Sequence, residues 1–196
     1  MTMLSVLRAA SFGLILAATG HGAMAQEAVV EALDVPGPIE FLDDSYALSW
    51  TSHPTADYFK QEYLPEGQQS DSYAAMFMVD ALTSAATPQG AVNTQITNLE
   101  QRKSTDPMVN YNQISNPESG DVILDFLLSD ESGPTAIIEW NAYRYTKLGD
   151  GIALYAISRR AYGDDIEAFL GQLGQMRQDN ISALAEYDLP PITPAE

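Results

Sequence analysis

Three apolar runs with an alternating pattern, between residues 122 and 161, constrain the fold of this chain more than any other feature. The first covers residues 122–128, and the other two cover residues 135–147 and 152–161. Alternation of this kind is typical of strands, since successive side chains point to opposite faces of a sheet. These residues are therefore predicted to build an antiparallel sheet.

The last two runs are joined by Leu148-Gly149-Asp150-Gly151, whose glycines suit the backbone of a hairpin turn. A tight turn here fixes three facing pairs: Tyr145 and Leu154, Glu139 and Arg160, and Trp140 and Arg159. The second pair would form an ion pair and the third a cation–π contact, each contributing about 0.5 kcal/mol.

A first helix is predicted over residues 87–103. Thr87 has an N-cap side chain, Pro88 suits the first helical position, and apolar residues follow at helical spacing. Further strands are predicted at residues 41–50, 58–64, 73–82 and 109–113. The run at 73–82 has apolar residues on both alternating sets, which is typical of a central strand covered on both faces.

A second helix is predicted over residues 164–186, beginning at Asp164 in a capping box with Glu167. Its apolar stripe consists of Ile166, Phe169, Leu170, Leu173, Met176, Ile181 and Leu184. Gly171 and Gly174 would each cost about 1 kcal/mol in an exposed helix. We therefore expect these two glycines to allow close packing of the helix on the sheet.

The amino-terminal 25 residues have the three parts of a secretory signal peptide. A single cation, Arg8, precedes a short apolar stretch, and the segment ends in Ala23-Met24-Ala25. Gly13, Thr19, Gly20 and His21 interrupt the apolar stretch, which falls short of the roughly 20 residues that span a bilayer. We expect cleavage between Ala25 and Gln26, no membrane insertion of the mature chain, and a periplasmic location, with secretion as the alternative.

Composition excludes several classes of site. The sequence has no cysteine, so it can form no disulfide, thiolate zinc site or iron–sulfur cluster. Its formal charge is −18, and it becomes −19 when residues 1–25 leave, because they hold Arg8 and no acidic residue. Such a charge repels phosphate backbones, so nucleic acid is not an expected partner. The oligomeric state stays open.

The mature chain is predicted to form one domain of α+β class, an antiparallel sheet with two helices packed on it. Residues 26–40 form an extended acidic lead-in, residues 41–186 the domain, and residues 187–196 an irregular proline-rich tail. We find no internal repeat in the sequence.

Motifs of familiar catalytic sites do not occur in the sequence, including the nucleophile elbow, the P-loop and the glycine-rich dinucleotide loop. His53 is the one histidine after residue 25, and a loop histidine beside Pro54 fits it better than a catalytic base. No catalytic residue, metal site or cofactor is therefore assigned.

Carboxylates are too numerous for any pair of them to carry much weight. Asp121 and Asp125 would share one face of a strand, and they suit an acid–base pair or, with Asp130 and Glu131, a Ca²⁺ site. In a chain with 27 acidic residues, such runs usually form a solvated face.

The hairpin at 135–161 gathers half of the cations of the mature chain beside aromatic side chains, and aromatic residues with polar tips often line binding sites. The candidate ligand-binding residues are Trp140, Tyr143, Arg144, Tyr145, Arg159 and Arg160. The alternative is that the tyrosines cover the sheet and that the cations neutralise neighbours such as Glu139.

The order of predicted elements is similar to that of the Mog1/PsbP-like α/β sandwich, over about residues 41–186. The run Glu62-Tyr63-Leu64-Pro65-Glu66-Gly67 also resembles stretches of exported bacterial proteins. This resemblance implies an antiparallel sheet with helices on its faces and a binding or accessory role, and it supplies no active site.

Three functions remain. The chain is expected to be a non-enzymatic accessory or binding protein that engages another envelope protein or a small ligand. The first alternative is an acidic immunity or inhibitor protein, steered by charge to a basic toxin or enzyme. The second is a hydrolase that uses His53 or the pair Asp121 and Asp125.

Overall fold

The computed structural model describes residues 29–195, which form eight strands and two α-helices. The strands are β1 (Ile39–Phe41), β2 (Asp44–Thr55), β3 (Tyr58–Leu64), β4 (Ala75–Leu82), β5 (Asn110–Ser115), β6 (Val122–Asp130), β7 (Ile137–Leu148) and β8 (Gly151–Tyr162). The helices are α1 (Pro88–Arg102), α2 (Ile166–Glu186) and the short 3₁₀ helix η1 (Gly163–Asp165).

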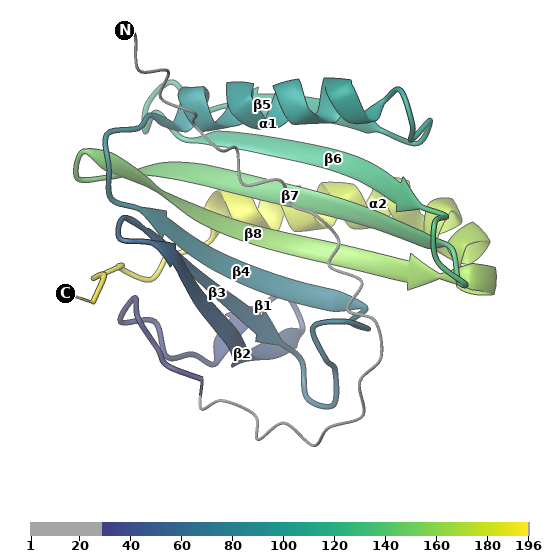
Figure 1. Ribbon diagram of the computed structural model, residues 1–196, viewed down its shortest axis with the longest axis horizontal. Helices are drawn as coiled ribbons and strands as arrows, with labels where there is room; N and C mark the ends of the chain where they lie inside the picture. The colour runs from purple at the N-terminus through teal and green to yellow at the C-terminus, as the bar shows by residue number, and fades with distance from the viewer. Residues whose placement is uncertain (1–28, 196) are drawn as a thin grey trace, which may run out of the picture.

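All eight strands form one antiparallel sheet in the order β1-β2-β3-β4-β8-β7-β6-β5. The sheet twists strongly, so that β1–β3 run at an angle to β5–β7 (Figure 1). The predicted α+β class, with an antiparallel sheet and two helices, is confirmed. Among the described residues, no helix is long and apolar enough to cross a membrane.

The two helices pack on opposite faces of the sheet (Figure 1). On the first face, called here the α2-side face, α2 covers β6, β7 and β8 over a core that includes Phe77, Tyr155 and Ile157. On the second, the α1-side face, α1 packs on β6 and β7 over a core that includes Phe126 and Tyr143. Strand β4 contributes alternate residues to both cores, which confirms its prediction as a central strand.

The predicted hairpin is confirmed together with its register. Strands β7 and β8 are joined by Gly149 and Asp150, and Gly149 has a φ of +55°. The three predicted facing pairs all occur: Tyr145 and Leu154, Glu139 and Arg160, and Trp140 and Arg159. The Glu139–Arg160 ion pair forms as expected. The guanidinium of Arg160 also lies over the ring of Tyr73, 3.9 Å from its centre.

The two helix starts turn out differently. Thr87 caps α1 as predicted, because its hydroxyl accepts a hydrogen bond from the Gly90 amide at 3.1 Å. The predicted capping box of α2 is wrong. A 3₁₀ turn precedes the helix, the cap is Asp165, and its side chain makes no capping hydrogen bond. The 3₁₀ turn displaces the helix start by two residues from Asp164.

The lead-in and the tail both pack against the α2-side core. Leu33 is fully buried, and its carbonyl accepts a hydrogen bond from the Thr193 amide at 2.8 Å. The carbonyl of Pro190 accepts a hydrogen bond from the Tyr155 hydroxyl at 2.6 Å. Residues near both ends of the described chain therefore help to cover the same face of the sheet.

The prediction that Gly171 and Gly174 allow close packing of α2 is wrong. Both lie on the exposed side of the helix, and a Cβ atom built on either would meet nothing within 4 Å. Gly151, at the start of β8, is the opposite case, because a Cβ there would lie 1.8 Å from the carbonyl oxygen of Leu82. The chain needs glycine at position 151 and does not need it for packing at positions 171 and 174.

We predict that Gly171→Ala and Gly174→Ala each raise the free energy of unfolding by up to about 1 kcal/mol, because alanine restricts the unfolded chain and favours the helix. Urea denaturation measures the change. Gly151→Ala is the control and should destabilise the protein. A loss of stability in either helix variant would show that the glycines contact something that the open helix surface does not suggest.

Candidate ligand-binding site

The six candidate residues of the hairpin divide between the two faces of the sheet. Trp140, Arg144 and Arg159 have their side chains on the α2-side face, whereas Tyr143, Tyr145 and Arg160 have theirs on the α1-side face. The period of two along a strand imposes this division. The structure therefore places three of the six residues on each face, so the six do not form one site.

The cations of the α2-side face hold α2 in place. Arg144 donates hydrogen bonds to Asp121 and to the carbonyl oxygens of Leu184, Ala185 and Tyr187, at distances from 2.8 to 3.2 Å. It thereby pairs with the unsatisfied carbonyls at the end of the helix.

Two further arginines bind the same helix or come from it. Arg159 donates to Asn180 of α2 at 3.2 Å and to Asp44 at 3.1 Å. Arg177 of α2 forms an ion pair with the buried Asp125 of β6. All three arginines of this face thus serve to attach α2.

We predict that Arg144→Met lowers the free energy of unfolding by about 2 kcal/mol, because Asp121 and the end of α2 lose their charged donor. Chemical denaturation measures it. The matched control is Lys103→Met, whose ion pair with Glu100 is exposed, so this change should have a clearly smaller effect than Arg144→Met. Equal effects of the two substitutions would contradict the role given to Arg144.

The residues considered for hydrolysis have structural partners, and His53 lies far from the two aspartates. Asp121 binds Arg144, and Asp125 binds Arg177. The expectation that His53 lies in a loop is wrong, because β2 continues to Thr55, and the His53 ring stacks on Phe59 with ring centres 4.0 Å apart. Four strands separate β2 from β6 in the sheet, which corresponds to roughly 24 Å. Within residues 29–195, no three His, Asp or Glu side chains are grouped to hold a metal ion.

On the α1-side face, Arg160 belongs to a hydrogen-bond network centred on Glu139. Glu139 accepts hydrogen bonds from Arg160 at 2.6 Å, from Tyr73 at 2.8 Å and from Asn141 at 2.9 Å. The hydroxyl of Tyr162 in turn donates to the Tyr73 carbonyl oxygen at 2.9 Å. The network ties β8 and β7 to the loop before β4.

A second cluster of polar side chains lies on the α1-side face, over β3 and β4, outside this network. Helix α1 lies over β6 and β7, away from β3 and β4 (Figure 1). We call this group the Asp80 site, and it consists of Trp50 of β2, Tyr58, Lys60 and Glu62 of β3, Met78 and Asp80 of β4, Leu154 of β8 and Tyr145 of β7. The strand registers place Lys60 opposite Asp80, Glu62 opposite Met78, and Trp50 opposite Glu62.

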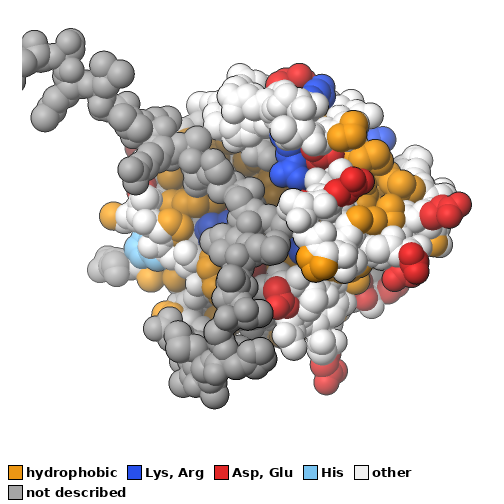
Figure 2. Space-filling model, turned by 45° about the vertical axis from the view of Figure 1, so that its right-hand side comes forward, with side chains coloured by type: hydrophobic (Ala, Val, Ile, Leu, Met, Phe, Trp, Pro, Cys, Tyr) orange, Lys and Arg blue, Asp and Glu red, His pale blue; other side chains and the backbone are white. Residues whose placement is uncertain are grey.

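Acidic charge by itself does not mark the site. Figure 2 shows acidic side chains spread over much of the visible surface of the described residues. What distinguishes the Asp80 site is a buried carboxylate, and three aspartates of the described chain are buried, namely Asp80, Asp106 and Asp125. Asp125 has Arg177 as its partner. The comparison that matters is between Asp106 and Asp80.

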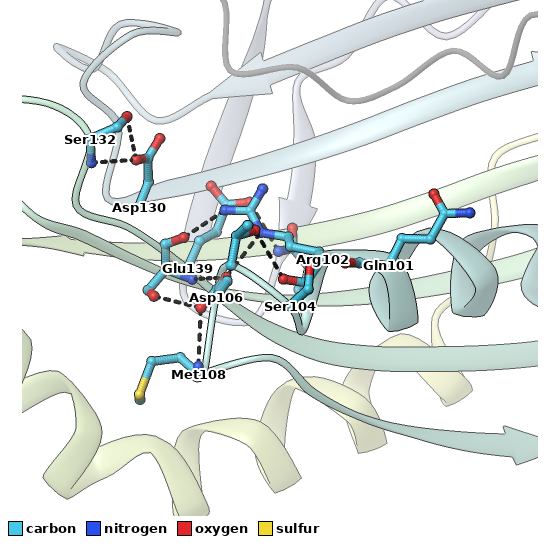
Figure 3. Close-up of polar contacts among 11 residues, drawn as sticks. Gln101, Arg102, Ser104, Asp106, Met108, Asp130, Ser132 and Glu139 are labelled. Atoms are coloured by element: carbon cyan, nitrogen blue, oxygen red, sulfur yellow. Dashed lines mark hydrogen bonds and ion pairs between the residues drawn. The ribbon is translucent and has the colours of Figure 1, made fainter.

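Asp106 shows how this fold satisfies a buried carboxylate (Figure 3). It accepts hydrogen bonds from the amide and the hydroxyl of Ser129 at 2.8 and 2.7 Å, from Arg102 at 2.9 Å and from the Met108 amide at 3.0 Å. Burial alone would raise the pKa of Asp106, but these donors outweigh it and hold the pKa below its usual value.

Asp80 is equally buried, with 3% of its surface exposed, and has one donor. The Tyr58 hydroxyl donates to Oδ2 at 2.7 Å, whereas Oδ1 has no hydrogen-bond partner among the described residues. Burial raises the pKa of Asp80 to about 6, although the charge of Lys60 and the hydrogen bond from Tyr58 oppose the rise. This oxygen is the buried acceptor that the fold leaves unsatisfied.

Glu62 reinforces the acidic character of the site. Burial raises its pKa, and Asp80 and Glu139 act in the same direction, against Lys60 and Arg160. Two carboxylates from neighbouring strands are thus held on one face beside the hydroxyl of Tyr58 and the ring of Trp50, which is 42% exposed. Such a site suits recognition of a hydrogen-bond donor better than of an anion.

We predict that the stability of the protein depends on pH through Asp80. Its pKa rises from 3.8 to about 6 in the folded state, so the folded state binds the proton more tightly than the unfolded chain. This group's contribution to stability is therefore present below about pH 4, and up to about 3 kcal/mol is lost as the pH rises to about 6 and above.

Asp80→Asn removes that loss, so the variant should gain stability relative to the wild type between about pH 4 and pH 7. Urea denaturation across this range measures the difference. Asp179→Asn, on the exposed side of α2, is the control and should show no such trend. A difference between Asp80→Asn and wild type that stays constant with pH would contradict the raised pKa.

The comparisons with known proteins bear on the extent of the folding unit. A protein-family model matches residues 33–189, about four fifths of the chain, and its description names no activity. The chain belongs to this family. The match begins at Leu33 and ends at Leu189, which both pack in the α2-side core. No curated protein matches the chain significantly.

Asp80 is not among the residues predicted from the sequence, although its position in β4 gives a signal. The run Ala75–Leu82 is apolar except for this one residue. A single acid in a strand that is covered on both faces must be buried, and a buried acid needs partners. Period and composition show that Asp80 is unusual, but only the packing shows that its partners are incomplete.

Proposed function

We propose that this chain is an exported, non-enzymatic accessory protein of the bacterial envelope, which binds a small ligand or a segment of a partner protein at the Asp80 site. The observation that carries the proposal is the buried Oδ1 atom of Asp80, which has no hydrogen-bond partner within residues 29–195. A buried polar atom without a partner is uncommon in folded proteins and calls for an explanation such as a missing ligand.

The surroundings of Asp80 support a binding role over a purely structural one. Asp106 and Asp125 are equally buried and receive their donors from the chain itself. The Asp80 site adds aromatic side chains with polar tips, Tyr58 and Tyr145, and the exposed ring of Trp50. Ligand-binding sites usually consist of aromatic and apolar side chains with a few polar groups that point toward the ligand.

Export and fold family are parts of the same proposal. Residues 1–25, which carry the predicted signal peptide, lie outside the described residues, and the proposal rests there on the sequence pattern. The helices on opposite faces of an antiparallel sheet, with the longer one at the carboxyl end, support a Mog1/PsbP-like sandwich. Such a fold leaves a binding role to be argued from its site.

A non-catalytic role is favoured because the acid–base candidates have other tasks. Asp121 and Asp125 are each bound to an arginine that attaches α2, and His53 packs on Phe59. None of the residues that make up the Asp80 site is a serine, threonine or cysteine, which are common nucleophiles of hydrolases.

The proposal is tested by identifying the molecules that co-purify with the protein and with two variants. The chain, expressed from its complete coding sequence, is isolated from the envelope fraction, and bound small molecules and proteins are identified by mass spectrometry. We expect at least one species that the wild type retains and that Trp50→Ala loses. The control is Leu170→Ala, which removes another exposed apolar side chain, on α2. A bound set that is the same in all three proteins would overturn the proposal.

A further inference from the structure

We infer that the Asp80 site binds an organic cation, in which an amino group on an apolar stem donates hydrogen bonds to Asp80 and lies beside Glu62. This inference rests on the proposed function and specifies its ligand.

The unsatisfied atom of Asp80 is a hydrogen-bond acceptor. Oδ2 accepts the hydroxyl of Tyr58, and Oδ1, with its lone pairs, has no donor among the described residues. The partner must therefore bring an N–H or O–H group to a buried position between β3 and β4. An anionic ligand would repel this oxygen.

A second carboxylate, that of Glu62, favours a positively charged ligand over a neutral one. Glu62 lies on β3 and on the same face as Lys60 and Asp80, and burial disfavours its charged form. An alkylammonium group has three donors, which suits two carboxylates on adjacent strands. A neutral alcohol has one donor and would leave one of the two carboxylates without compensation.

The chain itself supplies one cation to the site, the side chain of Lys60. Lys60 lies directly opposite Asp80 in the register, and its charge acts on both carboxylates. The acids exceed the cations even so, because Asp80 and Glu62 face a single lysine, while Arg160 is held by Glu139 and Tyr73. One further positive charge balances the site.

The apolar surroundings fit a stem of several carbon atoms. Met78, Leu154 and Ala156 line the face between Asp80 and the rings of Tyr143 and Tyr145, and all are less than one tenth exposed. Trp50, which faces Glu62, offers an exposed ring for a cation–π contact. A metal ion is disfavoured, since no three ligating side chains are grouped in the described part of the chain.

The groups that face Asp80 give the expected dependence on pH. Tyr58, Lys60 and Glu62 face it from β3, Leu154 from β8 and, one strand further, Tyr145 from β7. Of these, the two tyrosines stay protonated, because burial raises their pKa values. Asp80 has a pKa of about 6, and the raised pKa of Glu62 acts in the same direction, so affinity for a cation should rise as the pH rises.

The probe for the experiment is n-hexylamine, with 1-hexanol and hexanoate as the matched neutral and anionic compounds. Binding to the wild type is followed by calorimetry and by NMR of ¹³C-methyl methionine, in which Met76 and Met78 report on the site. We expect saturable binding of hexylamine that shifts these two methyl signals, with affinity about tenfold higher at pH 8 than at pH 5. The neutral and anionic compounds should bind at least tenfold more weakly.

Variants separate the site from general attraction to an acidic protein. Asp80→Asn and Glu62→Gln should each weaken hexylamine binding by about tenfold, with near-UV circular dichroism unchanged. Asp179→Asn, which removes an exposed charge on the other face, should leave the affinity as in the wild type. Equal binding of hexanol, or binding that survives both site substitutions, would overturn the inference.

The outcome also distinguishes this inference from the proposed function. If hexylamine does not bind, but a species from the envelope is still lost by Trp50→Ala and kept by Leu170→Ala, then the ligand class is wrong and the binding role stands. If neither the amine nor any envelope species depends on the site, both fail.

Discussion

The antiparallel pairing of β7 with β8 is the constraint on which the rest of the structure depends. It fixes the register of the two longest neighbouring strands, and through them it decides which side chain reaches which helix. A shift of one residue would exchange the two faces, so that Arg144 would point away from α2 and Tyr143 would enter its core. The two-residue turn at Gly149 and Asp150 and the pairing of Glu139 with Arg160 specify this register.

Because of this register, the polar side chains on the two faces of the sheet have different roles. On the α2-side face, Arg144, Arg159 and Arg177 are bound to carboxylates, an amide and helix carbonyls, so their charges attach α2 to the sheet. On the α1-side face, the network of Glu139, Arg160 and Tyr73 closes one end, and Asp80 is left with one donor. The contrast with Asp106, which has four hydrogen bonds, makes Asp80 the exception in this fold and therefore the place to look for function.

Much of the fold follows from local patterns, and the failures have local causes. The hairpin, its register, α1 with its Thr87 cap and the central position of β4 all come from period, turn residues and caps, which act over a few residues. The pattern predicts a start of α2 two residues too early, because a 3₁₀ turn replaces the capping box that Asp164 and Glu167 suggest. The pattern also predicts Gly171 and Gly174 on the packed side of α2, but they lie on its exposed side, because the sheet contacts other residues of the helix.

The sequence alone determined the class of the protein, the order of most of its elements and the pairing across the hairpin, because these depend on short-range periodicity and on turn geometry. It did not separate β1 from β2, because a turn at residues 42–43 divides what the pattern predicts as one strand at 41–50. It also determined which residue types were available for chemistry. The tertiary structure decided which of them meet. It divided the six hairpin residues between two faces, and it placed Lys60, Glu62 and Asp80 together from two strands whose register no local pattern specifies. The burial of a carboxylate, and the number of donors that reach it, depend on every element packed around it, so only the folded chain shows that Asp80 lacks a partner.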